Sequence, residues 1–193
     1  MSSAAVVQKP GPARGELLEL ARQRFLRGQR LDVQTLASEL GVSRATAYRW
    51  AGNADRLAAE VVAMIAEETF HRSARGVRSK GAERVVEVME KGMRAVVGSA
   101  PYRAFLERDP QKALRLVASK EGPSQARMVE LHQRLLEDEI ERGSLRIPVD
   151  PHTMAYALVR LAESFMYSDL IAGEEPDIDS AVEIVRLLLR SDA

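Results

Sequence analysis

The chain has 193 residues, 46% of them hydrophobic, and its 28 basic and 28 acidic side chains balance to no net charge. The length allows one hydrophobic core, or one core and a small second domain, and the absence of cysteine excludes disulfides, thiolate zinc sites and thiol nucleophiles. The start of the chain lacks the pattern of a signal sequence and no run approaches a membrane span, so we expect a cytoplasmic protein without membrane contact.

Apolar residues recur at helical spacing along almost the whole chain, which predicts an all-α fold of about nine helices. We expect a mobile tail at residues 1–12 and then a first helix that ends near Gly28. A second helix is predicted at 33–40, because Asp32 can cap its first amides and Gly41 can end it in a left-handed conformation.

Further caps and breaks divide the rest of the chain into helices. Ser43 can cap a short third helix that reaches residue 50, and Asn53 can cap a long fourth helix that extends to about residue 75. Glycine and proline then separate the remaining helices. We expect these after Gly81, after Pro101, from Pro110, from Pro123 to about Gly143, from Pro151 to about Ala172, and from Asp177 to Arg190.

Positive charge is concentrated near the start of the chain. Residues 1–58 carry nine basic and five acidic side chains, and the remainder is acidic by the same margin. Counterion release on binding a polyanion depends on local rather than net charge, so this asymmetry favours a basic module that contacts nucleic acid.

The segment 41–43 joins two short helices in a manner typical of a helix-turn-helix. Its glycine lets the chain reverse, and Ser43 directs the next helix so that free amides and the helix dipole face outward, where they favour phosphate. On that helix Arg44 suits the two major-groove acceptors of guanine, and Ala45 suits a thymine methyl group. Other outward positions suited to bases or phosphates are Gln34, Thr46, Tyr48 and Arg49.

Residues 17–57, and above all the segment LASELGVSRATAYRWAGNADRL at 36–57, resemble the N-terminal domain of the tetracycline-repressor (TetR) family. This motif spans only a small part of the chain. The order of one three-helix DNA-binding domain followed by about six further helices also fits the family. The resemblance implies a DNA-binding domain at 13–52 and a helical effector-binding and dimerisation domain at 53–193. With the outward positions above, the predicted DNA-binding set is Gln34, Ser43, Arg44, Ala45, Thr46, Tyr48, Arg49 and Trp50.

Three positions depart from the family pattern. Trp50 stands where the family usually has histidine or another aromatic residue, and Ala51 where it has a bulky apolar one. Ala54 replaces a common phosphate-contacting lysine, which should lower the salt slope of DNA binding by about one unit unless Arg49 or Arg56 substitutes.

The C-terminal part, from about residue 145 to 189, is similar to regulators of actinobacterial quorum-signal degradation. That resemblance implies an acyl lactone or a related amphiphile as effector. Methionine-rich, inward-looking helix faces favour an adaptable apolar pocket, although the same side chains also suit an ordinary core. The predicted pocket residues are Met64, Met89, Met93, Phe105, Met128, His132, Phe165, Met166 and Tyr167.

The last two helices carry more apolar surface than one buried face requires, which favours a homodimer. A single short helix reads too little DNA for useful discrimination, and a two-fold dimer on a near-palindromic operator supplies a second reader. The predicted dimer interface comprises Ala155, Leu158, Val159, Ala162, Ile178, Val182, Val185 and Leu189.

These features bear on three candidate functions. The first is a regulator of double-stranded DNA, in the family expectation a repressor that a small amphiphile releases from its operator. The second is an enzyme, which the sequence does not favour, because the three histidines are far apart and no metal, cofactor or nucleophile motif is found. The third is an architectural protein that keeps the helix-turn-helix for packing, a reading favoured by the small Ala51 and the missing lysine.

Overall fold

In the computed structural model, which describes residues 14–118 and 123–190, the chain is helical throughout, without a strand in these ranges. The predicted tail at 1–12 lies outside the described residues. Ten helices have eight residues or more, and α10 is a single turn. The helices are α1 (Arg14–Leu26), α2 (Val33–Leu40), α3 (Arg44–Ala51), α4 (Ala54–Ala74), α5 (Gly81–Val97), α6 (Ala100–Arg108), α7 (Pro110–Ala118), α8 (Pro123–Glu141), α9 (Pro151–Met166), α10 (Ser168–Ile171) and α11 (Ile178–Leu189).

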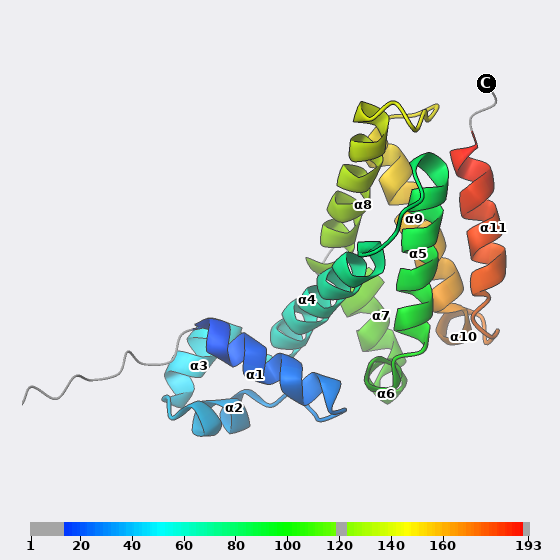
Figure 1. Ribbon diagram of the computed structural model, residues 1–193. Helices are drawn as coiled ribbons and strands as arrows, with labels where there is room; N and C mark the ends of the chain where they lie inside the picture. The colour runs from blue at the N-terminus through cyan, green and yellow to red at the C-terminus, as the bar shows by residue number, and fades with distance from the viewer. Residues whose placement is uncertain (1–13, 119–122, 191–193) are drawn as a thin grey trace, which may run out of the picture.

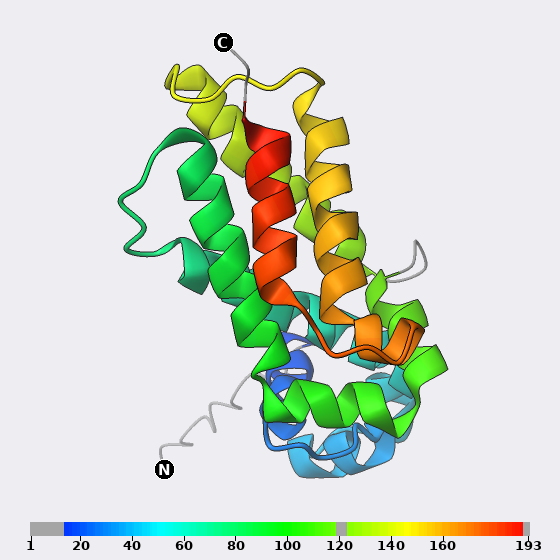
Figure 2. The ribbon, with the colours of Figure 1, turned by 90° about the vertical axis from the view of Figure 1, so that its right-hand side faces the viewer.

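The helices form a small three-helix unit and a larger bundle (Figure 1). Helices α1 to α3 gather at one end, and α4 runs from them into the bundle of α5, α8, α9 and α11. Figure 2 shows α11 between α5 and α9, on the face of the bundle turned toward the viewer. One hydrophobic core lies within the bundle, and a second extends from α1, α2 and α3 to α6 and α7. Helix α4 contributes side chains to both cores and so connects them.

Local chemistry explains where the first helices begin and end. The Asp32 carboxylate accepts a hydrogen bond from the Thr35 amide at 2.8 Å, and Asn53 Oδ1 accepts one from the Arg56 amide at 2.8 Å. Gly41 has φ +66°, a left-handed conformation that ends α2. The predicted caps and boundaries of α2, α3 and α4 are therefore confirmed.

The helix predicted from Pro151 to about Ala172 is wrong in one respect, since it breaks at Tyr167. Tyr167 has φ −114° and ψ 18°, which is not helical, and its side chain is buried. Its hydroxyl lies 2.8 Å from that of Tyr102 on α6. This long-range contact favours the break, and helical periodicity carries no information about it.

Glu139 joins the start of α5 to the end of α8 and is only 1% exposed. Its Oε2 accepts hydrogen bonds from the Gly81 amide at 2.7 Å and the Ser144 hydroxyl at 2.8 Å, and Arg142 donates to Oε1 at 2.6 Å. Burial raises the pKa of this carboxyl, but the hydrogen bonds outweigh that effect and hold its pKa below the usual value. An ionised carboxylate therefore links the end of α8 to the start of α5 through hydrogen bonds.

Candidate DNA-binding surface and effector cavity

Helix α3 is held by a short turn and a side-chain cap. The Ser43 hydroxyl accepts a hydrogen bond from the Thr46 amide at 3.1 Å and lies 3.0 Å from the Thr46 hydroxyl. Ala47 and Ala51 form the buried face of α3 against α1 and α2. The small Ala51, 3% exposed, thus lies in the core of the three-helix unit.

The opposite face of α3 is open to solvent. Arg44, Ala45, Tyr48 and Arg49 are exposed, as is Gln34 on α2. These five are the members of the predicted DNA-binding set that are exposed and whose side chains make no hydrogen bond or ion pair among the described residues.

The other three predicted residues have local roles. Ser43 is exposed, but its hydroxyl caps α3, and Thr46 is half-buried beside it. Trp50 is half-buried and packs against the core of the three-helix unit. The two hydroxyls are therefore engaged within the protein, and much of the indole is turned away from solvent.

Arg14 ties the end of α3 to α4, a contact that the sequence analysis missed. Its Nε donates to the Trp50 carbonyl at 3.2 Å, and its Nη2 pairs with Glu60 on α4. Arg56 lies 3.7 Å from the same glutamate. The contacts of Arg14 join residues that are 36 and 46 positions apart in the sequence, and helical periodicity carries no information about contacts at such separations.

A cavity of about 280 Å³, partly open to solvent, lies mainly between α4, α5, α8 and α9. Six of the nine predicted pocket residues line it: Met89, Met93, Met128, His132, Met166 and Tyr167. Three do not. Met64 is half-buried elsewhere on α4, Phe165 packs beside the bundle core, and Phe105 contacts Phe25 at a ring-centroid distance of 5.3 Å.

Two buried tyrosines form one polar end of the cavity. The hydroxyls of Tyr102 and Tyr167 are hydrogen-bonded at 2.8 Å. Burial raises the pKa of Tyr102 to about 12 and that of Tyr167 well above its ordinary value, so both are neutral at physiological pH. One proton serves the mutual bond, which leaves the other O–H free to donate to a ligand. The sequence analysis missed Tyr102.

Two titratable side chains complete the lining. His132 Nδ1 lies 2.8 Å from the Met128 carbonyl, which assigns the proton to Nδ1 and leaves Nε2 as an acceptor. Burial lowers the pKa of His132, which keeps it neutral. Burial also raises the pKa of Glu163, whose carboxylate accepts from Arg160 at 2.7 Å and Gln125 at 3.4 Å. The buried part of the polar lining therefore offers neutral hydrogen-bonding groups and one paired carboxylate, and the exposed Arg72 adds a positive charge.

The predicted dimer interface is wrong in its register. All eight predicted residues are buried within the single chain, because α9 and α11 turn their most apolar stripes toward α5, α8 and each other. A second, narrower apolar stripe stays exposed on these helices, and its members are Tyr156, Ile184, Leu187 and Leu188. Periodicity indicates an inner stripe but does not say whether the same chain or a second copy covers it.

Among residues 14–118 and 123–190, no helix has the length and hydropathy needed to span a membrane. The same ranges bring no three His, Cys, Asp or Glu side chains together as a metal-ion site.

A capped helix-turn-helix, joined by one long helix to a bundle that contains a cavity, defines a transcriptional regulator of the helix-turn-helix class. Residues 80–190 match the family described as tetracyclin repressor-like, C-terminal domain. This match covers more than half of the chain, which therefore belongs to the TetR family of transcriptional regulators.

Solved structures agree with this assignment. The chain is 30% identical to the R. erythropolis transcriptional repressor QsdR, with a TM-score of 0.86 and coverage of 93% of this chain and 97% of that one. It shares the fold of AlkX from Dietzia sp., at 18% identity, a TM-score of 0.63 and coverage of 95% and 100%. The fold also matches reduced NemR from E. coli, at 15% identity, a TM-score of 0.58 and coverage of 93% and 99%. A comparison with curated proteins gives no match.

Proposed function

We propose that the protein is a dimeric repressor that binds a near-palindromic operator and is released from it by a neutral amphiphile. The observation that carries this proposal is the link between the two sites through α4. This helix begins at Ala54, next to the three-helix unit, and its residues Ile65, Thr69 and Phe70 line the cavity. Repression is supported by the resemblance to QsdR, a transcriptional repressor.

We assign DNA recognition to the exposed face of α3, within a DNA-binding domain at 13–52. Arg44, in the first turn, is the base reader, because its guanidinium can pair with O6 and N7 of guanine. Tyr48 and Arg49 contact phosphate, and Gln34 on α2 adds a further contact. The amide of Thr46 is satisfied by the Ser43 cap, so Ser43 supports the helix end without reading a base.

Replacing Arg44 tests the proposed reading of DNA. An operator is first isolated by selection from a random duplex library with the full chain. Arg44→Ala should then weaken binding to that operator by about 1–3 kcal/mol and change binding to random DNA little. Fluorescence anisotropy at several salt concentrations measures both affinities. Arg78→Ala, an exposed arginine in the loop between α4 and α5, is the matched control and should leave both affinities unchanged.

Two outcomes would contradict this assignment. Equal loss on operator and random DNA would show that Arg44 contacts only phosphate. Failure of the selection to enrich any sequence would favour an architectural protein, because such a protein binds without selective footprints.

Dimerisation is assigned to the domain at 53–193, through the exposed apolar stripe on α9 and α11. Tyr156, Ile184, Leu187 and Leu188 lie on the two helices that a two-fold axis would pair into a four-helix interface. The inner apolar stripes of α9 and α11 remain in the hydrophobic core of each subunit and do not contribute to the proposed interface.

The cavity lining supports a neutral ligand with an apolar body and a hydrogen-bond acceptor. Methionine side chains adapt to an acyl chain, and the free tyrosine O–H can donate to a carbonyl oxygen. A free carboxylate would be disfavoured beside the buried Glu163 and the neutral His132, and the one basic lining residue, Arg72, is exposed to solvent. An acyl lactone satisfies these conditions, and binding that shifts α4 lowers operator affinity by reciprocal linkage, typically by about 1–3 kcal/mol.

Removing both cavity hydroxyls tests this ligand class. The double variant Tyr102→Phe/Tyr167→Phe should bind octanoyl-homoserine lactone about tenfold more weakly, because a buried carbonyl loses its donor. Isothermal titration calorimetry measures the dissociation constant. Tyr48→Phe, on the exposed face of α3 and outside the cavity lining, is the matched control and should bind the lactone as the wild type does. Unchanged affinity in the double variant would rule out a carbonyl hydrogen-bonded to the tyrosines.

A further inference from the structure

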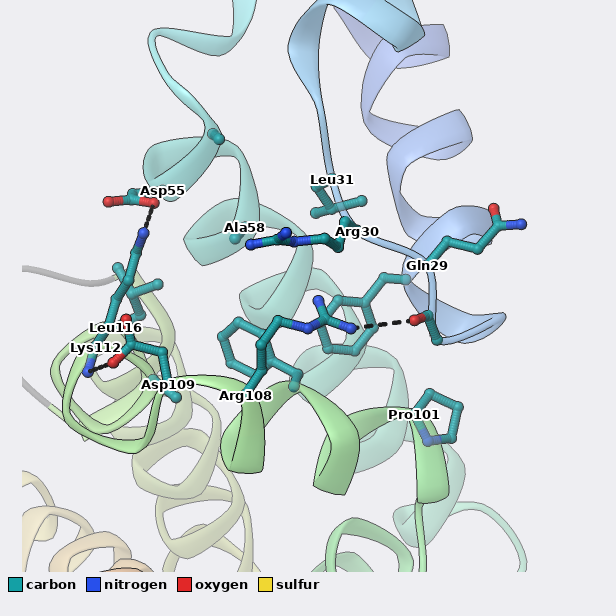
Figure 3. Close-up of a pocket in the computed structure, with 15 residues that line it drawn as sticks. Gln29, Arg30, Leu31, Asp55, Ala58, Pro101, Arg108, Asp109, Lys112 and Leu116 are labelled. Atoms are coloured by element: carbon teal, nitrogen blue, oxygen red, sulfur yellow. Dashed lines mark hydrogen bonds and ion pairs between the residues drawn. The ribbon is translucent and has the colours of Figure 1, made fainter.

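A second pocket, of about 270 Å³, lies between the three-helix unit and the bundle, and it shares no lining residue with the effector cavity. One wall is the segment from Gly28 to Leu31, between α1 and α2, and another is the start of α4. The third wall is formed by α6 and α7 (Figure 3). Any ligand held here therefore contacts both units of the protein.

The inner surface of this interdomain pocket is largely apolar. Phe25 and Phe105 pack together at a centroid distance of 5.3 Å with an interplanar angle of 55°. Leu31, Ala58 and Leu116 add aliphatic surface around these rings. This surface suits a short hydrocarbon chain or a ring.

The charges around this pocket are unevenly engaged. Both acidic side chains already have partners: Asp55 pairs with Lys112, and Asp109 Oδ1 accepts from the Lys112 backbone amide at 3.2 Å. Arg108, by contrast, donates one hydrogen bond, to the Gly28 carbonyl at 3.3 Å. Arg30 makes no hydrogen bond or ion pair within residues 14–118 and 123–190.

The two arginines approach from opposite walls. Figure 3 shows Arg30 extending from the α1–α2 segment across Ala58 and Arg108 rising from α6 toward the same segment. Each guanidinium carries five N–H donors, so most of their donors are unused. Guanidinium forks pair with carboxylates through two parallel hydrogen bonds.

We propose that this interdomain pocket is a second ligand site, which binds a small organic monocarboxylate with an apolar body. The carboxylate bridges Arg30 and Arg108, and the apolar body lies against Phe25 and Phe105. The effector cavity has the neutral His132 and the carboxylate of Glu163 among its buried groups, and its one basic lining residue, Arg72, is exposed. The interdomain pocket instead has two arginines with unused donors, so we expect the two pockets to prefer ligands of different charge.

Octanoate tests the proposal, with octan-1-ol as the neutral probe of equal chain length. Isothermal titration calorimetry on the full chain should show octanoate binding that weakens at least about tenfold in Arg30→Gln/Arg108→Gln, because two charge-assisted hydrogen-bonding groups are removed. The variant should leave octan-1-ol binding unchanged. Arg75→Gln/Arg78→Gln removes the same charge from the exposed end of α4 and the loop after it, and should bind octanoate as the wild type does.

Three outcomes would overturn the proposal: no octanoate binding to the wild type, equal affinity in the pocket variant, or equal loss in both double variants. The last would show nonspecific attraction by net positive charge. None of these measurements involves DNA or the lactone, so failure here is distinguishable from failure of the proposed repressor function.

Discussion

Leu187→Glu is expected to convert the protein to a monomer and to weaken operator binding by at least about 100-fold. Leu187 is 61% exposed within one chain and lies on the outer stripe of α11. In a two-fold interface the same substitution occurs on both subunits, so two carboxylates lose water together and repel each other. A monomer presents one recognition helix and loses the contacts of the second half-site.

Analytical ultracentrifugation and operator anisotropy measure the two effects. Val149→Glu is the control, because Val149 is also an exposed aliphatic residue, at 43%, but lies in the loop before α9. It should leave the oligomeric state and operator affinity unchanged. A Leu187→Glu protein that remains dimeric would place the interface elsewhere, and a monomer with full operator affinity would refute the need for a dimer.

Gly81→Ala is expected to lower the free energy of unfolding by about 3–5 kcal/mol, through strain and the disruption of a buried pair. Gly81 has φ +59°, and a Cβ atom there would lie 2.2 Å from the Ser144 carbonyl oxygen. Relief of this clash must move the loop after α8 or the start of α5. Either movement disturbs the hydrogen bond from the Gly81 amide to the buried carboxylate of Glu139.

The same loop offers a matched control for this variant. Gly143 has φ +69°, but a Cβ atom there meets nothing within 4 Å. Gly143→Ala should therefore cost only the left-handed conformation, about 1–2 kcal/mol. Urea unfolding followed by circular dichroism measures both. Equal losses in the two variants would show that the contact with Ser144 is relieved without consequence.

Much of the three-helix unit was predictable, because the interactions that set its helix boundaries are local. Asp32, Ser43 and Asn53 each satisfy amides within three residues of themselves, and Gly41 needs only its own left-handed conformation. Such interactions depend on neighbours in the chain. The sequence therefore predicts the ends of α2, α3 and α4 without knowledge of the rest of the fold.

The cavity was predictable in part. The periodicity of α5 and α8 indicates their inward faces, which carry Met89, Met93, Met128 and His132 into the lining. Periodicity does not say which neighbour an inward face meets, so Phe105 packs against Phe25 instead. The pairing of Tyr102 with Tyr167 depends on a contact across 65 residues and on the break after α9.

The sequence by itself determined an all-helical chain, the helix-turn-helix and its exposed arginine, because these follow from short-range hydrogen bonding and the 3.6-residue period. Only the tertiary structure decided which apolar stripe of α9 and α11 is core and which stays exposed. It also decided that Arg30 and Arg108 face one pocket. The physical reason is that burial and the convergence of charges arise from the packing of distant helices, and an amphipathic pattern is satisfied equally well by its own chain or by a second copy.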